Sequence, residues 1–158
     1  MQHDYYYIQE WKPELKRKAE DLIKKIHDVA PELEVLFMGA AALGLPGKND
    51  LDLDILCDQH DLKRYVHVIM SVLGTPKELN EVMAIWSYED EGIEIDCILS
   101  DDKRTGSHVP KQKAIFEKLK ASPELQERYR KLKYEWSGLP YEQYETKKKE
   151  FLKEVEDL

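Results

Sequence analysis

Apolar side chains recur with two different periods along the chain, and each period predicts a different kind of element. Over residues 12–29 and 62–73 they return every three to four positions, which predicts two amphipathic helices. Residues 34–38 form a short apolar run, and residues 50–57 alternate strictly between polar and apolar. Both of these segments therefore read as strands, and residues 39–44 between them as a turn into a short helix.

The second half of the chain changes from strands to helices. Residues 82–88 and 92–99 flank a polar turn, which predicts an antiparallel hairpin. Helical patterns then follow at residues 111–120, 123–135 and 141–157. The expected fold is α+β (α/β), with a small mixed sheet flanked by helices and a C-terminal helical tail.

Three aspartates occupy one side of the alternating strand. Asp50, Asp52 and Asp54 share a face, while the residues between them are apolar. Strands disfavour Asp, and like charges on one face repel. Carboxylates at positions 50 and 52 have Cβ atoms about 6–7 Å apart, a spacing that lets both converge on a metal pair. The pattern indicates a hard divalent cation, above all Mg²⁺, which takes carboxylate oxygens and keeps positions open for substrate phosphates.

Two further features accompany this run. Gly39 follows the first expected strand, and Asp96 lies on the later alternating strand, where it shares a face with Glu94. A glycine turn, an Asp-x-Asp strand and a later strand with a lone Asp make an order of elements that resembles the nucleotidyltransferase superfamily, the fold of DNA polymerase β. The resemblance implies that Asp50 and Asp52 hold the metals and that Asp96 is the third carboxylate. In that superfamily the third carboxylate also takes a proton from the attacking hydroxyl.

A second resemblance covers nearly the whole chain. Tyr7-Ile8-Gln9-Glu10-Trp11-Lys12-Pro13 is similar to the opening of the GrpB family, and residues 115–125 are similar to its tail. The same tail similarity extends to Tyr129, Lys133, Tyr144, Lys148 and Phe151. GrpB proteins belong to the nucleotidyltransferase-fold group. The resemblance implies one domain over residues 1–158, with a core at 1–100 and the helical tail at 111–158.

The chain departs from the GrpB pattern at two places. The family has Gly-Ser-Thr at the turn, where this chain has Gly39-Ala40-Ala41, and Lys-Pro before its aspartate, where this chain has Lys48-Asn49. In the GrpB alignment Asp52 takes the main aspartate and Asp54 follows it. The metal pair is therefore either Asp50 with Asp52 or Asp52 with Asp54.

Three residues are candidates for holding phosphate. Gly39 would let backbone N–H groups approach a phosphate at the start of the short helix, although a plain strand-to-helix turn needs the same glycine. Ala40 lacks the hydroxyl that contacts the triphosphate in the superfamily, which predicts weak turnover or none. Lys48, in the loop entering the Asp strand, either meets a phosphate or is a solvated loop lysine.

For several other residues the sequence predicts a surface or core position, or leaves that alternative open. His108 lies in the loop before the tail, where it faces the site or is merely exposed. The tail also carries basic candidates, most of them expected to be surface charges: Lys111, Lys113, Arg128, Arg130 and Lys133. Three aromatic residues are expected to pack in the core rather than stack on bases: Trp11, Tyr7 and Tyr134.

Charge and cysteine content narrow the class of protein. The net charge of −8 argues against a broad nucleic-acid surface. The chain has no apolar run long enough for a membrane span, and its N-terminus lacks the pattern of a signal peptide. Cys57 and Cys97 both fall on apolar strand faces, which predicts buried free thiols and a cytoplasmic location.

The sequence therefore predicts Mg²⁺-dependent binding of a nucleoside triphosphate, with transfer of a nucleotidyl group to an acceptor hydroxyl if the protein is active. Asp50, Asp52 and Asp96 are the expected metal ligands and catalytic groups, and Gly39, Ala40 and Lys48 the expected phosphate contacts. The alternative is a binding module that keeps the fold and an acidic pocket without chemistry. The sequence identifies neither the acceptor nor the preferred base.

Overall fold

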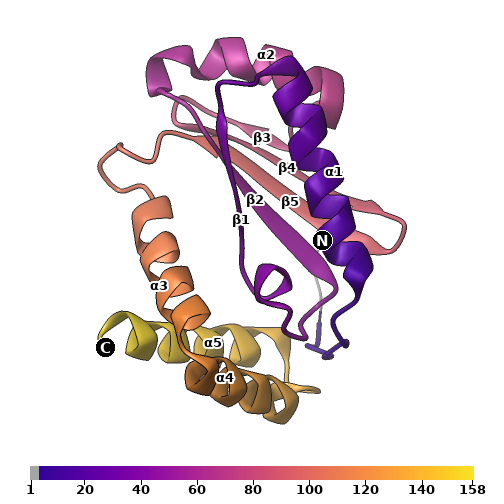
Figure 1. Cartoon of the computed structure of the whole chain (residues 1–158), viewed down its shortest axis with the longest axis vertical. Coiled ribbons are helices and arrows are strands. Elements are labelled where there is room, and N and C mark those ends of the chain that lie inside the picture. Colours follow the sequence, from indigo (N-terminus) through magenta and orange to yellow (C-terminus); the bar gives the residue numbers. More distant parts are fainter. Residues whose placement is uncertain (1–3) are drawn as a thin grey trace.

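The computed structural model describes residues 4–158 and contains a five-stranded mixed sheet (Figure 1). The strands lie in the order β1-β2-β5-β4-β3, and β2 and β5 run parallel while the other pairs are antiparallel. Their bounds are β1 (Glu34–Met38), β2 (Asp50–Leu56), β3 (Glu78–Leu79), β4 (Met83–Asp90) and β5 (Ile93–Ser100). The mixed sheet and the hairpin of β4 and β5 confirm the prediction. The two-residue β3 was not predicted, because it is exposed and too short to show an alternating pattern.

Helices pack on the sheet and extend past it, as expected. Figure 1 shows α1 and α2 against the sheet and α3, α4 and α5 gathered at one end of the molecule. Their bounds are α1 (Pro13–Val29), α2 (Leu62–Leu73), α3 (Val109–Ala121), α4 (Pro123–Trp136) and α5 (Tyr141–Glu156), with short 3₁₀ turns η1 (Ala41–Leu43) and η2 (Gln59–Asp61). Within residues 4–158, no helix combines the length and apolar character needed to cross a membrane.

The main core lies between the sheet and the first two helices. Leu51, Leu53 and Ile55 of β2 point into it and are at most 1% exposed. Burying a side chain of this size contributes about 1.5–3 kcal/mol. Cys57 and Cys97 are free thiols buried on the same side, as predicted. Because side chains alternate along a strand, this packing directs the aspartates of β2 to the opposite face.

A second core holds the helical tail to the N-terminal segment. Tyr6 is buried and stacks on Tyr144 of α5 with ring centroids 3.8 Å apart. The expectation that Tyr7 is a core residue is wrong, since it is 64% exposed. Residues 5–7 lie in an extended segment, so neighbouring side chains point to opposite sides.

Tyr134 is also not a core residue, because it is 44% exposed. The inward face of α4 repeats at Tyr129, Lys133 and Trp136, all of which are buried, and Tyr134 lies outside that helical stripe. Trp11 is partly buried against the main core and donates a hydrogen bond to the Ala41 carbonyl oxygen at 2.9 Å. The expectation therefore holds for Trp11 alone of the three.

Candidate active site

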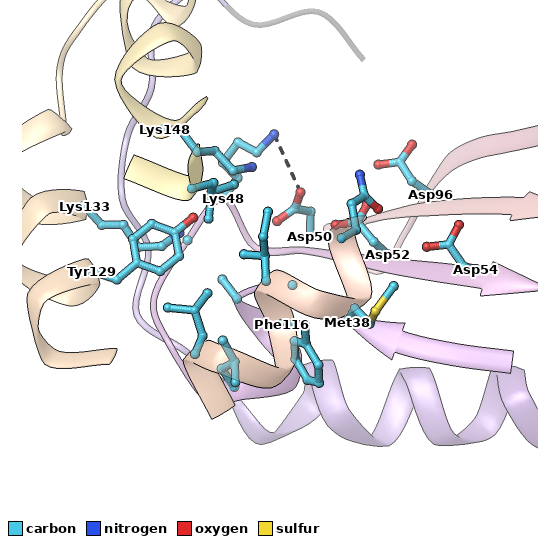
Figure 2. A pocket seen from close by; sticks show the side chains of 18 of the residues that line it. Met38, Lys48, Asp50, Asp52, Asp54, Asp96, Phe116, Tyr129, Lys133 and Lys148 are labelled. Carbon is cyan, nitrogen blue, oxygen red and sulfur yellow. Dashed lines mark ion pairs between the residues drawn. The ribbon is translucent and has the colours of Figure 1, made fainter. Parts of the chain in front are cut away.

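The structure brings Asp50, Asp52 and Asp96 together, as the sequence predicts. Each offers a carboxylate oxygen, and these oxygens lie within 4.8 Å of one another. The parallel pairing of β2 with β5 explains this, because it sets Asp52 directly opposite Asp96. Figure 2 shows the three side chains on one side of a pocket.

Such a carboxylate group suits a divalent metal. Hard cations such as Mg²⁺ prefer oxygen ligands, and the two ions of a paired site lie about 3.5–4 Å apart, a spacing that clustered carboxylates can bridge. Asp96 is also held in place, because the Ser87 hydroxyl on β4 donates a hydrogen bond to its Oδ1 at 2.6 Å. Sequence reasoning missed Ser87, although its position opposite Asp96 in the hairpin was a usable signal.

Asp52 has an unusual acidity. Its carboxylate is open to solvent through the pocket but stands among protein atoms on the pocket floor. This burial, together with the nearby charges of Asp50 and Asp96, raises the pKa of Asp52 to about 7, and the ammonium groups of Lys148 and Lys48 oppose the shift only in part. A proton would therefore compete near neutral pH with any metal ion that this carboxylate binds.

We expect Mg²⁺ affinity to depend on pH as a result. Below about pH 7 Asp52 is mostly protonated, so Mg²⁺ must displace a proton and its affinity should fall about tenfold per pH unit. Above pH 7.5 the affinity should become nearly constant. Calorimetric titration of Mg²⁺ between pH 5.5 and 8.5 measures this curve, and a flat profile would contradict the proton competition.

Asp54 does not join the group. It is buried, and its Oδ1 lies 2.8 Å from Nε2 of His108. Burial raises the pKa of Asp54, and the hydrogen bond and charge of His108 counteract that rise. The close carboxylate oxygens are those of Asp50, Asp52 and Asp96, and Asp54 lies outside that group. His108 therefore holds Asp54 instead of standing free in solvent.

The turn after β1 approaches the carboxylates closely. Gly39 has φ +91, and a Cβ at this position would lie 3.4 Å from Asp52 Oδ2. Ala40 follows, lines the pocket and leads into η1. The turn therefore favours glycine for its backbone conformation, and a side chain added here would contact Asp52.

Replacing Gly39 by alanine should cost about 1–2 kcal/mol of stability, because an L-residue is strained at this φ. Gly44→Ala is the matched control, since Gly44 also has positive φ but no atom within 4 Å of its added Cβ. Urea denaturation should show a loss in both variants. Mg²⁺ affinity should fall only in Gly39→Ala, and equal affinities in the two variants would refute the link to Asp52.

Lys48 lies at the edge of the triad. Its Nζ donates a hydrogen bond to the Tyr141 hydroxyl at 2.8 Å and lies 3.6 Å from Asp50 Oδ2. Burial alone would lower the pKa of Lys48, but Asp50 and Tyr141 raise it, so the side chain is charged. The next residue, Asn49, has φ +60. Proline cannot adopt that angle, so the backbone here requires another residue type.

The triad opens into a pocket of about 270 Å³ between the sheet and the helical tail. Figure 2 shows the aspartates toward one end and Lys48, Lys133 and Lys148 toward the other. Apolar side chains of α3 line the space between them, including Ile115, Phe116 and Leu119. The pocket thus has an acidic end and a basic end.

Sequence reasoning missed the importance of two of these lysines. Lys133 Nζ lies 4.5 Å from the ring centroid of Tyr129, and Lys148 Nζ lies 5.8 Å from that of Tyr144. Each pair is spaced i, i+4 on its own helix, α4 or α5, so the repeated Tyr-x-x-x-Lys was the signal. The other basic candidates lie at the surface, where Lys111, Arg128 and Arg130 pair with glutamates and Lys113 is exposed.

Comparison with known sequences gives no relative. No protein-family model matches the chain, and no curated protein matches it.

Comparison with solved structures gives clear matches. One is the RNA terminal uridylyl transferase Cid1, with a TM-score of 0.52, 16% identity and coverage of 77% of this chain and 39% of that one. Another is the Cid1 poly(U) polymerase with Mg and 3′-dATP bound, with a TM-score of 0.50, 19% identity and coverage of 75% and 40%. The chain spans about two fifths of these proteins. At this identity the likeness shows the fold, which is that of the nucleotidyltransferases.

Proposed function

We propose that this protein binds a Mg²⁺–nucleoside triphosphate and transfers the nucleotidyl group to an acceptor hydroxyl. The observation that carries the proposal is the pocket itself, in which three convergent carboxylates face three lysines. A metal–triphosphate has the matching distribution of charge, with cations beside the reacting phosphate and anionic oxygens along the tail. The fold of the solved relatives supports the same reading.

The three carboxylates have distinct roles in the proposed reaction. Asp50, Asp52 and Asp96 form a donor set of oxygens alone, which fits Mg²⁺. When bound, Mg²⁺ would supply charge stabilisation for the attacking and leaving oxygens of an in-line displacement. Asp96, oriented by Ser87, accepts the proton of the acceptor hydroxyl as that oxygen bonds to the α-phosphorus.

The lysines act on the leaving group of the proposed reaction, which is pyrophosphate. As the new P–O bond forms, the bond to the β-phosphate oxygen breaks and pyrophosphate leaves with its negative charge. Lys48 and Lys148 are charged and line the pocket, so they stabilise that charge. Burial alone would lower the pKa of Lys148, but Tyr129, Glu145, Asp52 and Asp50 raise it.

We extend the proposal to the whole chain. The GrpB resemblance supports one domain over residues 1–158, and the tail helices supply a wall of the same pocket. The two buried free cysteines favour the cytoplasm, where thiols stay reduced.

A second candidate function is binding without chemistry. Ala40 favours it, because this residue has no hydroxyl to offer the triphosphate. Such a module would keep the metal and nucleotide contacts but leave the α-phosphate intact. The acceptor is then irrelevant, and nucleotide binding itself is the function.

Two assays test the proposal in sequence. Titration calorimetry with ATP, UTP, GTP and CTP, each with and without Mg²⁺, should show binding only with the metal. Incubation with nucleotides labelled at the α- or γ-phosphate should then transfer only the α label. Binding without transfer across a panel of hydroxyl acceptors would favour the non-catalytic module, and no Mg²⁺-dependent binding would refute both.

A further inference from the structure

Lys133 has surroundings that are unusual for a lysine. Its side chain is 2% exposed, and it borders the pocket from α4. Within residues 4–158, no carboxylate lies at ion-pair distance from its Nζ, which stands over the ring of Tyr129. Lysine is almost never fully buried unless it is paired. A buried amine facing an open pocket without a carboxylate indicates that its partner is a ligand.

Two of the three charged groups that face Lys133 are cations. Lys148 comes from α5, Lys48 from the loop before β2, and Asp50 from β2, while Tyr129 lies on α4 with it. Burial lowers the pKa of Lys133 to about 7, with Lys148 and Lys48 adding to the shift and Asp50 opposing it. Lys133 thus differs from the other two lysines, whose pKa values are raised.

We propose that Lys133 is a neutral amine in the empty pocket and takes up a proton from solvent when the triphosphate binds. The inference rests on the proposed function and adds to it a proton-linked recognition of the phosphate tail. Phosphate oxygens would supply the negative charge that no carboxylate of residues 4–158 places at ion-pair distance from Lys133. The amine becomes an ammonium that donates hydrogen bonds to them, and one proton enters with each ligand.

The position of Lys133 indicates that the proton uptake depends on the phosphate tail of the ligand. Its Nζ lies 3.7 Å from the point where a Cβ on Gly47 would stand, and the same point is 3.7 Å from the Ala40 Cβ. Lys133 therefore lies beside the turn that would hold the distal phosphates. A nucleoside monophosphate, which is too short to reach past the metal site, should bind with less proton uptake.

Calorimetry at pH 8 in two buffers of different ionisation enthalpy measures the proton uptake, with Mg²⁺ present throughout and a non-hydrolysable ATP analogue as ligand. At this pH Asp52 is already ionised, so its proton does not contribute. Wild type should take up close to one proton per ligand, and its affinity should fall about tenfold per unit from pH 7.5 to 9.5. Lys131→Met, which removes an exposed lysine of the same helix, should behave as wild type.

Two substitutions of Lys133 complete the test. Lys133→Met should bind more weakly at pH 7, take up no proton and lose the pH dependence. Lys133→Arg carries a permanent charge, so it should bind the ATP analogue without proton uptake. This second variant keeps the test decisive if the methionine variant misfolds. Wild-type binding without uptake, or unchanged uptake in either folded variant, would overturn the inference and leave the proposed function standing. Absence of nucleotide binding in wild type would overturn both.

Discussion

Asp52→Asn should abolish Mg²⁺-dependent nucleotide binding and leave the fold intact. Asp52 stands opposite Asp96 and two residues from Asp50, so its carboxylate lies at the centre of the group. Even residues that only orient a metal ligand are worth about 10–100-fold in metal affinity, so loss of the ligand itself should cost at least about a hundredfold. Titration calorimetry with Mg²⁺ and a triphosphate gives the affinities, and circular dichroism checks the fold.

The same variant should be more stable than wild type without metal. The pKa of Asp52 is raised in the folded state, so the folded protein binds more protons than the unfolded chain between about pH 4 and 7. Wild-type stability should therefore fall as pH rises through that window, and the variant should escape this fall. Urea denaturation at pH 4 and pH 8 compares the two proteins.

Glu94→Gln is the matched control. Glu94 lies on β5 in register with Asp50 but outside the group of close carboxylate oxygens. This control should keep Mg²⁺-dependent binding within a few-fold of wild type. Unchanged binding in Asp52→Asn, or equal losses in both variants, would refute the assignment of Asp52 as a ligand.

Ala40→Ser should tighten triphosphate binding about ten- to a hundredfold. Ala40 lines the pocket, so the substitution would add a hydroxyl where the proposed function places the phosphates. One hydrogen bond to a charged phosphate is worth about 1.5–3 kcal/mol, which corresponds to that range of affinity. Calorimetry with tri-, di- and monophosphates should show the gain shrinking with phosphate length.

Ala42→Ser adds the same hydroxyl two residues further along the chain, at a position that does not line the pocket. It should leave all affinities unchanged. Equal affinities for wild type and Ala40→Ser at every phosphate length would show that this turn does not hold phosphate, and would favour the non-catalytic module.

The sequence predicts local structure well here because the hydrophobic periods are clear. The alternation in β2 identifies a strand with an apolar and an acidic face, and the structure shows both. The convergence of Asp50 and Asp52 with Asp96 was also predictable, since a parallel or antiparallel neighbour strand would place a polar face beside a polar face.

Tertiary packing decides what the sequence does not show. Asp54 continues the acidic row by pattern, but the loop before α3 brings His108 onto it and takes it out of the group. The i, i+4 spacing places Lys133 beside Tyr129 on α4, but only the packing of α4 against α5 shows that this face is buried. Such contacts join segments far apart in the chain, so no local period indicates them.

The most direct test of the account is a crystal structure with Mn²⁺ and a non-hydrolysable nucleoside triphosphate. Mn²⁺ takes the same oxygen ligands as Mg²⁺ and is located by its anomalous scattering. We expect metal at the oxygens of Asp50, Asp52 and Asp96, with the phosphate tail running toward Lys48, Lys133 and Lys148. Metal absent from these carboxylates, or a triphosphate bound outside the pocket, would contradict it.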